Sequence, residues 1–242
     1  MKMQLRLSLP LLVLTAFLMS IPATCRAQLV PPGDFRGKSL DEWGLDYLQW
    51  SLKTVLGEQT LPDTFDGVRY LPPNFGGGDF VADLTIDKAT AVMSEPFAVF
   101  GEQYDNGTED NPNDPFIDTI FDETTVRVTY DGSVVLEGIA SDLSDRLFGV
   151  TVFPQPIPYA MPQPRGPGLN STAAIFGIGI VTIFDMLPVG EHTIKNEFNS
   201  SVFGASSYTY NITVIPEPCT LYCLWAPVMA LLVARGRVRR HA

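Results

Sequence analysis

The alternation of apolar and polar residues predicts that much of the chain is β-structure. Apolar side chains occupy every second position in residues 80–86 and 208–214, as in strands that bury one face. In residues 126–136 two such runs flank Asp131 and Gly132. This dipeptide favours a two-residue turn, so a β-hairpin is expected there.

Three apolar runs and one proline-rich stretch complete the pattern. Residues 97–100 and 147–153 are further expected strands, and residues 173–184 form a nearly continuous apolar run with two glycines. The last run is typical of a central strand that is covered on both faces. Residues 154–168 contain six prolines. Because proline cannot donate to a sheet ladder, this stretch predicts a semi-rigid extended excursion outside the sheet interior.

One stretch has helical periodicity instead. Ser39 followed by Glu42 forms a capping box, and Gly57 is placed to end a helix, so we expect an amphipathic helix over residues 40–56. Its aromatic residues could form a sugar-stacking platform, but a stripe at this spacing more often packs in a core. We therefore expect a core role for Trp43, Tyr47 and Trp50.

Short strands, turn signals and one preceding helix predict a mainly β fold. We expect an antiparallel β-sandwich, Ig-like or jelly-roll-like, with one N-terminal helix, over residues 28–213. The segment Leu-Pro-Val-Gly-Glu-His-Thr-Ile at residues 187–194, followed by residues 208–214, resembles the closing strands of secreted Ig-like modules. The Trp-rich helix placed before the strands resembles a group of uncharacterised exported bacterial proteins. Neither resemblance implies an activity.

The first 27 residues have the pattern of a secretory signal peptide. Lys2 and Arg6 precede an apolar centre at residues 7–21, and Cys25 and Ala27 place small residues at the −3 and −1 positions of a cleavage site. Signal peptidase would cut after Ala27. A lipoprotein signal using Cys25 is disfavoured, because the three preceding residues, Pro-Ala-Thr, lack the leucine that such a site wants.

The chain ends in a second targeting pattern, residues 214–242. Pro216, Glu217 and Pro218 are followed by an apolar run at residues 220–234 and a basic tail at residues 235–242. The arginines of that tail are Arg235, Arg237, Arg239 and Arg240. Basic residues after a short apolar segment stay on the cytoplasmic side of a membrane.

This tail resembles the PEP-CTERM sorting signal of Gram-negative bacteria. The resemblance implies export across the inner membrane, transient anchoring there by the apolar helix, and processing near the Pro-Glu-Pro tripeptide by an exosortase. The product would stay at the cell surface or enter the extracellular matrix. Cys219 departs from the family, in which a small hydroxyl residue is commoner, and no role is assigned to Cys219 or Cys223.

Two alternatives remain for the apolar run. As a helix, its 15 residues would span about 22 Å, which is less than the ~30 Å hydrocarbon core, and Pro227 weakens its interior. These features favour a transient sorting helix over a permanent tail anchor. The four arginines disfavour the other alternative, a buried C-terminal helix.

Trimming both ends changes the composition of the remaining domain. Residues 28–215 hold 9 basic and 26 acidic residues, a net charge of −17, and no cysteine. Disulfides are therefore excluded as a source of stability. So acidic a surface repels nucleic acid and anionic lipid, and it suits divalent cations or a hydrated matrix. A nucleic-acid partner is not expected.

The sequence offers little for catalysis. His192 is the one histidine in residues 28–215, so common zinc sites and a Cys-His nucleophile are excluded there. A Ser-His-Asp triad would need His192, which follows a turn at the start of a strand. We expect a surface or hydrogen-bonded structural histidine and no catalytic residue.

One stretch could bind a metal. Residues 102–123 hold eight carboxylates and no basic residue. The candidate calcium ligands, spaced around Gly107, are Asp105, Glu109, Asp110 and Asp114. Their spacing does not match an EF-hand, and a solvated acidic loop is the alternative. The same stretch could supply a glycosidase carboxylate pair, which needs two groups roughly 5–10 Å apart.

Three functions follow from these patterns. The leading expectation is a non-enzymatic exported protein of the cell surface or extracellular matrix, associated with exopolysaccharide. The alternatives are a calcium-dependent carbohydrate-binding module and a glycan hydrolase. The expected transient partners are signal peptidase, the exosortase and the inner membrane.

Overall fold

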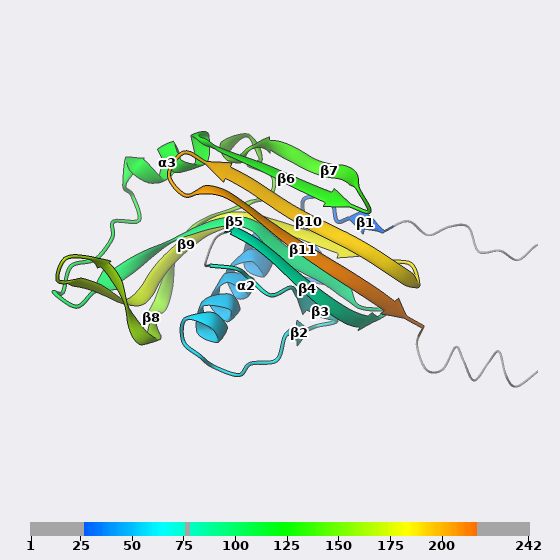
Figure 1. The fold of residues 1–242 in the computed structure, drawn as a ribbon, viewed down its shortest axis with the longest axis horizontal. Coiled ribbons are helices and arrows are strands. Elements are labelled where there is room, and N and C mark those ends of the chain that lie inside the picture. Colours follow the sequence, from blue (N-terminus) through cyan, green and yellow to red (C-terminus); the bar gives the residue numbers. More distant parts are fainter. Residues whose placement is uncertain (1–26, 76–77, 217–242) are drawn as a thin grey trace, which may run out of the picture.

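The computed structural model describes residues 27–75 and 78–216, and within them two β-sheets pack face to face (Figure 1). The predicted mainly β class is confirmed, and the two packed sheets agree with a β-sandwich. Residues 1–26 of the predicted signal peptide and 217–242 of the predicted sorting signal lie outside the described residues. Val214 and Ile215, at the start of the predicted sorting signal, belong to the last strand of the domain. No helix in the described ranges is both long and apolar enough to cross a membrane.

The described residues form a six-stranded and a five-stranded sheet, two α-helices and one 3-10 turn. The six-stranded sheet has the order β1-β9-β5-β3-β2, with β8 also paired to β9, and comprises β1 (Gln28–Leu29), β2 (Thr64–Phe65), β3 (Val68–Tyr70), β5 (Ala91–Tyr104), β8 (Leu147–Gly166) and β9 (Leu169–Asp185). The five-stranded sheet has the order β4-β11-β10-β6-β7, with β4 (Gly78–Asp87), β6 (Thr124–Tyr130), β7 (Ser133–Ile139), β10 (Gly190–Ser200) and β11 (Gly204–Ile215). The helical elements are α2 (Leu40–Val55), α3 (Pro115–Asp122) and η1 (Ala140–Asp142).

The expectation of purely antiparallel sheets is wrong. β4 runs parallel to β11, and β3 runs parallel to β5. The chain leaves the six-stranded sheet after β3, forms β4 at the edge of the other sheet, and returns to the first sheet in β5. These crossings join strands of different sheets, so hairpin connections do not fix their directions.

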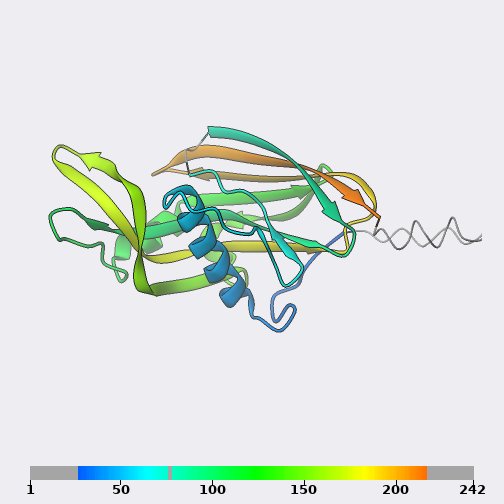
Figure 2. The same ribbon diagram turned by 90° about the horizontal axis from the view of Figure 1, so that it is seen from below.

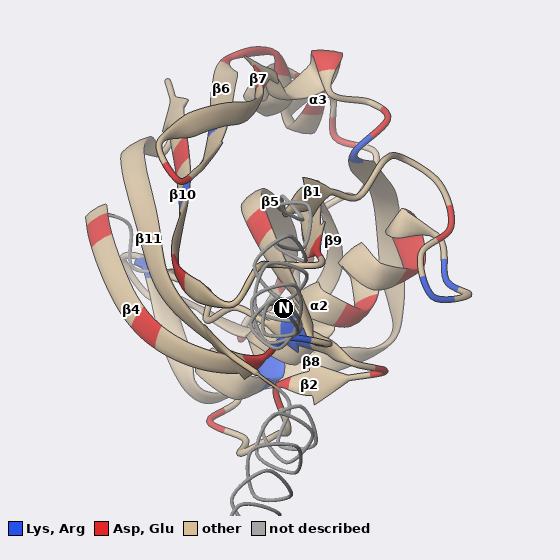
Figure 3. Ribbon diagram, turned by 90° about the vertical axis from the view of Figure 1, so that its right-hand side faces the viewer, with Lys and Arg blue, Asp and Glu red and all other residues tan. Residues whose placement is uncertain are grey.

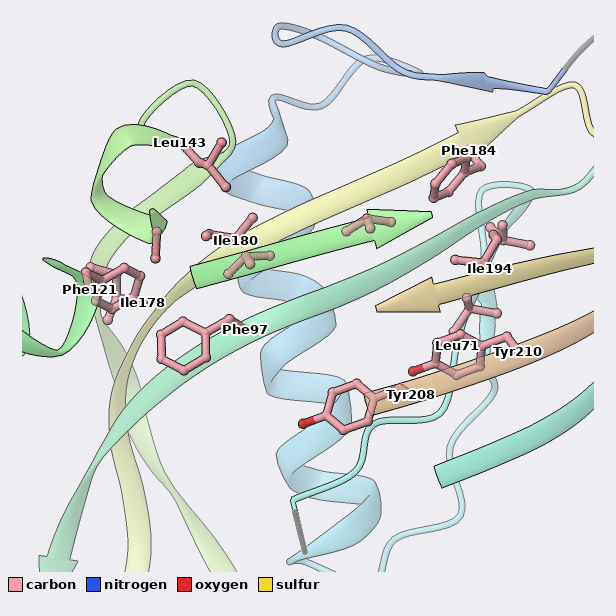
Figure 4. Close-up of a cluster of buried hydrophobic side chains, with 14 of the residues drawn as sticks. Leu71, Phe97, Phe121, Leu143, Ile178, Ile180, Phe184, Ile194, Tyr208 and Tyr210 are labelled. Atoms are coloured by element: carbon pink, nitrogen blue, oxygen red, sulfur yellow. The ribbon is translucent and has the colours of Figure 1, made fainter. Parts of the chain in front are cut away.

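The β9 strand is the predicted strand with two covered faces. It pairs with β5 on one side and with β8 and β1 on the other. Ile180 and Phe184 face the five-stranded sheet in the inter-sheet core, to which β11 contributes Tyr210 (Figure 4). Val181 and Ile183 pack in the second core, beneath α2.

The α2 helix lies across the outer face of the six-stranded sheet (Figure 2). Both hydrogen bonds of the predicted capping box are present between Ser39 and Glu42. Trp43 and Tyr47 are buried, and the Tyr47 hydroxyl donates to the Leu71 carbonyl oxygen at 2.6 Å. The aromatic stripe therefore belongs to the core, as predicted, and does not form a sugar platform.

The predicted hairpin at Asp131 and Gly132 is confirmed. Both residues have positive φ angles, 47° and 76°. This backbone conformation forms a two-residue turn whose twist matches that of the flanking strands. The turn joins β6 to β7. Asp131 Oδ1 also accepts a hydrogen bond from the Thr193 amide at 2.8 Å, which ties the hairpin to β10.

The expected proline-rich excursion is instead part of β8. Residues 154–166 belong to this strand, which pairs with β9 through several register shifts. β8 lies at a sheet edge. There the proline nitrogen, which carries no hydrogen, can face away from the neighbouring strand, so no ladder hydrogen bond is lost. The β8–β9 hairpin projects from the end of the molecule opposite to the two ends of the described chain (Figure 1).

Gly179 on β9 lets the neighbouring strands β5 and β8 pack closely. A Cβ atom added to Gly179 would lie 2.8 Å from Ala98 Cβ and 2.9 Å from the Phe97 carbonyl oxygen. We predict that Gly179→Ala lowers the free energy of unfolding by about 1–3 kcal/mol, because a backbone neighbour cannot move aside cheaply. Urea denaturation measures this change.

Gly149→Ala is the matched control. No atom lies within 4 Å of a Cβ built at Gly149 on β8. Its effect should stay within about 0.5 kcal/mol. Equal destabilisation by the two substitutions would contradict the close-approach explanation.

Candidate functional site

The predicted calcium ligands do not converge. Asp105 accepts hydrogen bonds from Asn170, and Glu109 accepts one from Gln103 Nε2 at 2.9 Å. In residues 27–75 and 78–216 no group of three or more Asp, Glu, His or Cys side chains could hold a metal. The interpretation of these carboxylates as one cluster is therefore corrected.

Asp110 and Asp114 have separate structural roles. Asp110 accepts from the Glu102 amide and from the Tyr104 hydroxyl, at 2.9 and 2.8 Å. Asp114 is the N-cap of α3 and accepts from the Phe116 amide at 2.9 Å. Each carboxylate satisfies nearby donors of its own segment, so no common centre forms.

Helix α3 is not among the elements that the sequence predicted. Asp114 and Pro115 form a helix-start signal, and Ile117, Ile120 and Phe121 follow at helical spacing and are buried. This signal lies inside the acidic stretch of residues 102–123, for which a calcium site or a solvated loop was expected. The acidic residues face solvent, while the apolar stripe holds α3 to the inter-sheet core.

Glu102, the first carboxylate of the stretch, is buried at 5% exposure. The Tyr159 hydroxyl donates to its Oε1 at 2.9 Å, and Arg165 Nε and Nη2 donate to its two oxygens at 2.5 Å. The hydrogen bond to Glu102 raises the pKa of Arg165. This ion pair joins β5 to the β8 edge strand close to the turn of the projecting hairpin.

Beside this pair is a groove of about 530 Å³ between the sheets, here called the inter-sheet groove. Its lining comprises residues 73–75, β5 residues 95–100, and Phe198, Phe203 and Tyr208 from the β10–β11 hairpin, with Glu102 and Arg165 at one end. Phe97 and Tyr208 project from opposite walls (Figure 4). Phe203 is 54% exposed, so the apolar lining reaches solvent.

A β-bulge places Glu95 in the groove. The pairing of β5 with β9 shifts between Ser94 and Phe97, which leaves Glu95 and Pro96 as the irregular residues. Before the bulge Val92 faces the inter-sheet core, and after it Phe97 does. An odd spacing between two residues on one face requires an inserted residue, and such insertions re-aim side chains.

The Glu95 carboxyl is not satisfied by the surrounding protein. Its Oε1 is buried and has no hydrogen-bond partner among the described residues, although the residue as a whole is partly exposed. Burial raises the pKa of Glu95 well above its ordinary value. A raised pKa favours the neutral carboxyl, which can donate as well as accept a hydrogen bond.

A second polar side chain nearby lacks a partner. Asn196 pairs with Tyr208 in the β10–β11 ladder and is fully buried. Neither atom of its side-chain amide is hydrogen-bonded within the described part of the chain. Buried polar groups are rarely left in this state, so the inter-sheet space around the groove has unused hydrogen-bonding capacity.

The two carboxyl groups of the groove are badly placed for glycoside hydrolysis. Glu95 and Glu102 lie seven residues apart on one strand, which corresponds to roughly 23 Å at ~3.3 Å per residue. An acid/base pair needs about 5–10 Å. Glu102 is also fully engaged by Tyr159 and Arg165.

His192 has a structural environment, as expected. Its Nδ1 lies 2.7 Å from the Tyr130 hydroxyl and 2.9 Å from Asp131 Oδ2, and its Nε2 lies 2.9 Å from the Pro188 carbonyl oxygen. Its ring stacks on Tyr130, with centroids 5.4 Å apart. These contacts join the β6–β7 hairpin to the start of β10.

The outer face of the five-stranded sheet is a second candidate surface, here called the polar sheet face. Its central residues alternate with buried ones along β10 and β11 and are Thr193, Lys195, Glu197, Thr209, Asn211 and Thr213. Arg127 and Glu137 extend it across β6 and β7 and form an ion pair at 3.7 Å. The Asp and Glu residues of the molecule lie on many different elements and are not gathered on one of them (Figure 3).

The helix α2 covers the outer face of the other sheet, whereas the central residues of the polar sheet face are exposed or only partly buried. A shallow depression of about 810 Å³ crosses this face, between Asp79 on β4 and Glu137 on β7. Its lining mixes polar and apolar residues and holds charges of both signs. Such a surface can form many hydrogen bonds while remaining hydrated.

No protein-family model matches the sequence, and no curated protein matches it either.

The buried ion pair generates a stability prediction. Arg165→Met should destabilise the fold by about 2 kcal/mol, because Glu102 would keep its burial but lose its cation. The figure is below the usual cost of breaking a buried pair because the Arg165 side chain is 41% exposed. The double variant Glu102→Gln, Arg165→Met should recover part of the loss. Urea denaturation of the two single variants, Glu102→Gln and Arg165→Met, and of the double variant measures this. Strictly additive losses would contradict the coupling.

The Glu95 carboxyl generates a pH prediction. Its pKa is higher in the folded than in the unfolded chain, so the unfolded state releases the proton first as the pH rises. Stability should therefore fall as the pH rises above the ordinary carboxyl pKa, until the folded pKa is reached. Glu95→Gln should flatten this dependence in denaturation curves at several pH values. Glu191→Gln, which removes an exposed carboxyl of β10, is the matched control. Identical pH profiles for Glu95→Gln and the parent would contradict the assignment of this pH dependence to Glu95.

Proposed function

We propose that this chain is an exported, non-enzymatic protein of the cell surface or extracellular matrix that associates with exopolysaccharide through its polar sheet face. The observation that carries the proposal is the outer face of the five-stranded sheet, which no other element covers within residues 27–75 and 78–216. It presents hydroxyl, amide and paired charged side chains. Polysaccharides present closely spaced hydroxyl groups, and a regular array of such side chains matches them.

The spacing of the polar sheet face supports this choice. Neighbouring strands lie ~4.8 Å apart, and residues on one face repeat every ~7 Å along a strand. Thr193 lies opposite Asn211, and Lys195 lies opposite Thr209. Donors and acceptors therefore recur at distances comparable to those between hydroxyl groups of adjacent sugar units. Direct and water-mediated hydrogen bonds would hold the polymer.

The targeting segments supply the location. The signal peptide at residues 1–27 and the PEP-CTERM-like tail at residues 214–242 support export, anchoring in the inner membrane and processing by an exosortase. The described chain begins and ends at the same end of the sandwich (Figure 1). A domain held from that end leaves the polar sheet face free along its side. An Ig-like or jelly-roll-like kinship of the sandwich is part of the same proposal.

The binding prediction is tested with the mature domain, residues 28–215, and exopolysaccharide from the producing cells. The domain should co-sediment with the polymer and should not cleave it. The triple variant Thr193→Ala, Thr209→Ala, Asn211→Ala should reduce the bound fraction several-fold, because it removes three central hydrogen-bonding groups.

A matched triple variant at exposed polar positions away from this face, Gln59→Ala, Asn113→Ala, Gln155→Ala, serves as the control and should bind like the parent. Equal loss in both variants, or no sedimentation of the parent, would overturn the assignment to this face. Release of reducing ends by the parent would overturn the non-enzymatic role.

Processing is tested by mass spectrometry of the mature surface protein. We expect no peptide that contains Arg235 to Arg240, and an N-terminus at Gln28. Recovery of the arginine tail in mature surface protein would contradict exosortase processing and favour a retained anchor.

A further inference from the structure

The backbone of β5 has a gap in its hydrogen bonding on the side that faces away from β9. At one end of the gap β3 pairs with residues 91–93, and the Leu71 amide donates to the Met93 carbonyl oxygen. At the other end, the Asp110 amide donates to the Glu102 carbonyl oxygen, and the Tyr104 amide donates to Thr108. Between these ends, residues 94–101 pair with β9 alone within the described residues.

The sequence explains why the gap begins where it does. Leu71 is followed by Pro72 and Pro73, which have no N–H group and cannot continue the ladder. The chain then turns away toward the facing sheet, where the Tyr210 hydroxyl donates to the Pro72 carbonyl oxygen at 2.9 Å. Residues 73–75 form the outer wall of the inter-sheet groove instead of a strand beside β5.

The gap and the inter-sheet groove coincide. Residues 95–100 of β5 line the groove. After the bulge, residues 97–101 pair with β9 without a register shift, so this part of the edge is regular. It is a template about 17 Å long for another strand, at ~3.3 Å per residue.

We infer that the inter-sheet groove binds an extended, uncharged, apolar polypeptide segment, which adds a strand to the free edge of β5. The occupant is a polypeptide because only a peptide backbone alternates donors and acceptors in register with an open strand edge. This strand addition is independent of glycan binding at the polar sheet face.

The lining specifies the side chains of the segment. Successive residues of an added strand point to opposite faces of the sheet. On one face they meet Phe97, Phe203 and Tyr208, and on the other they meet Phe75 and Phe100, whose rings lie 5.6 Å apart. Both faces are aromatic and favour apolar side chains. The buried Oε1 of Glu95, which has no partner within the described residues, provides an acceptor for a main-chain amide near the start of the segment.

The probe is a synthetic peptide of about seven residues that alternates valine and threonine, with blocked ends. Alternating valine and proline gives a matched control peptide that cannot pair. The mature protein should bind the first peptide and not the second in calorimetric titration. Hydrogen exchange followed by mass spectrometry should show slower deuterium uptake in residues 94–101 when the first peptide is bound.

Two exposed phenylalanines provide matched protein variants. Phe203 in the groove is 54% exposed, and Phe116 on α3 is 53% exposed, so neither substitution should unfold the protein. Phe203→Ala should weaken peptide binding about tenfold, from lost apolar contact, and Phe116→Ala should leave it unchanged.

The proposal would be overturned by no binding of the pairing peptide, or by equal binding of both peptides. Binding without protection of residues 94–101, or equal effects of the two phenylalanine substitutions, would overturn it as well. Displacement of the peptide by exopolysaccharide would also overturn it, because the groove would then be a glycan site.

Discussion

The fold depends on the burial of β9 on both of its faces. One face packs against the five-stranded sheet and the other against α2. A strand in this position cannot carry large side chains everywhere, so Gly177 and Gly179 occupy positions where Leu48 and Phe148 come close. The hydrophobic effect acts on both faces at once. The other strands of this sheet, and α2 above it, are arranged around that double layer.

β5 packs against the same two layers, but it is a less regular strand than β9. Before the bulge at Glu95 and Pro96, even-numbered residues of β5 such as Val92 face the five-stranded sheet, and after it odd-numbered residues such as Phe97 do. Apolar side chains lie on both faces before and after the bulge. The reversal introduces a carboxyl among aromatic side chains. Pro72 and Pro73 end the pairing of β5 with β3 beside this bulge, so the groove, Glu95 and the free edge lie together.

Local signals in the sequence predicted much of the fold. The Asp131-Gly132 turn, the apolar run of β9 and the core role of Trp43 and Tyr47 depend on short-range pattern, and the structure agrees with each. The parallel pairing of β4 with β11 depends on where the chain crosses between sheets, which no local pattern encodes. β8 was misassigned because proline excludes a strand from a sheet interior but not from an edge.

The candidate sites were harder to predict than the fold. Charge drew attention to residues 102–123, but those carboxylates serve caps, turns and one buried ion pair. Glu95 gave a weaker signal, a Glu-Pro pair that interrupts the apolar run of residues 91–100. That interruption indicates a bulge, but only the packing of the two sheets shows that the carboxyl becomes buried beside a groove.

The position of β11 determines how the domain would respond to force. This strand lies between β10 and β4 and leads directly to the C-terminal segment. A pull on a molecule tethered at that end acts along the strand axis, while the ladder hydrogen bonds lie across it. The load is therefore shared by two ladders in shear, and they cannot open one bond at a time. A surface protein attached in this way would resist drag from the surrounding polymer.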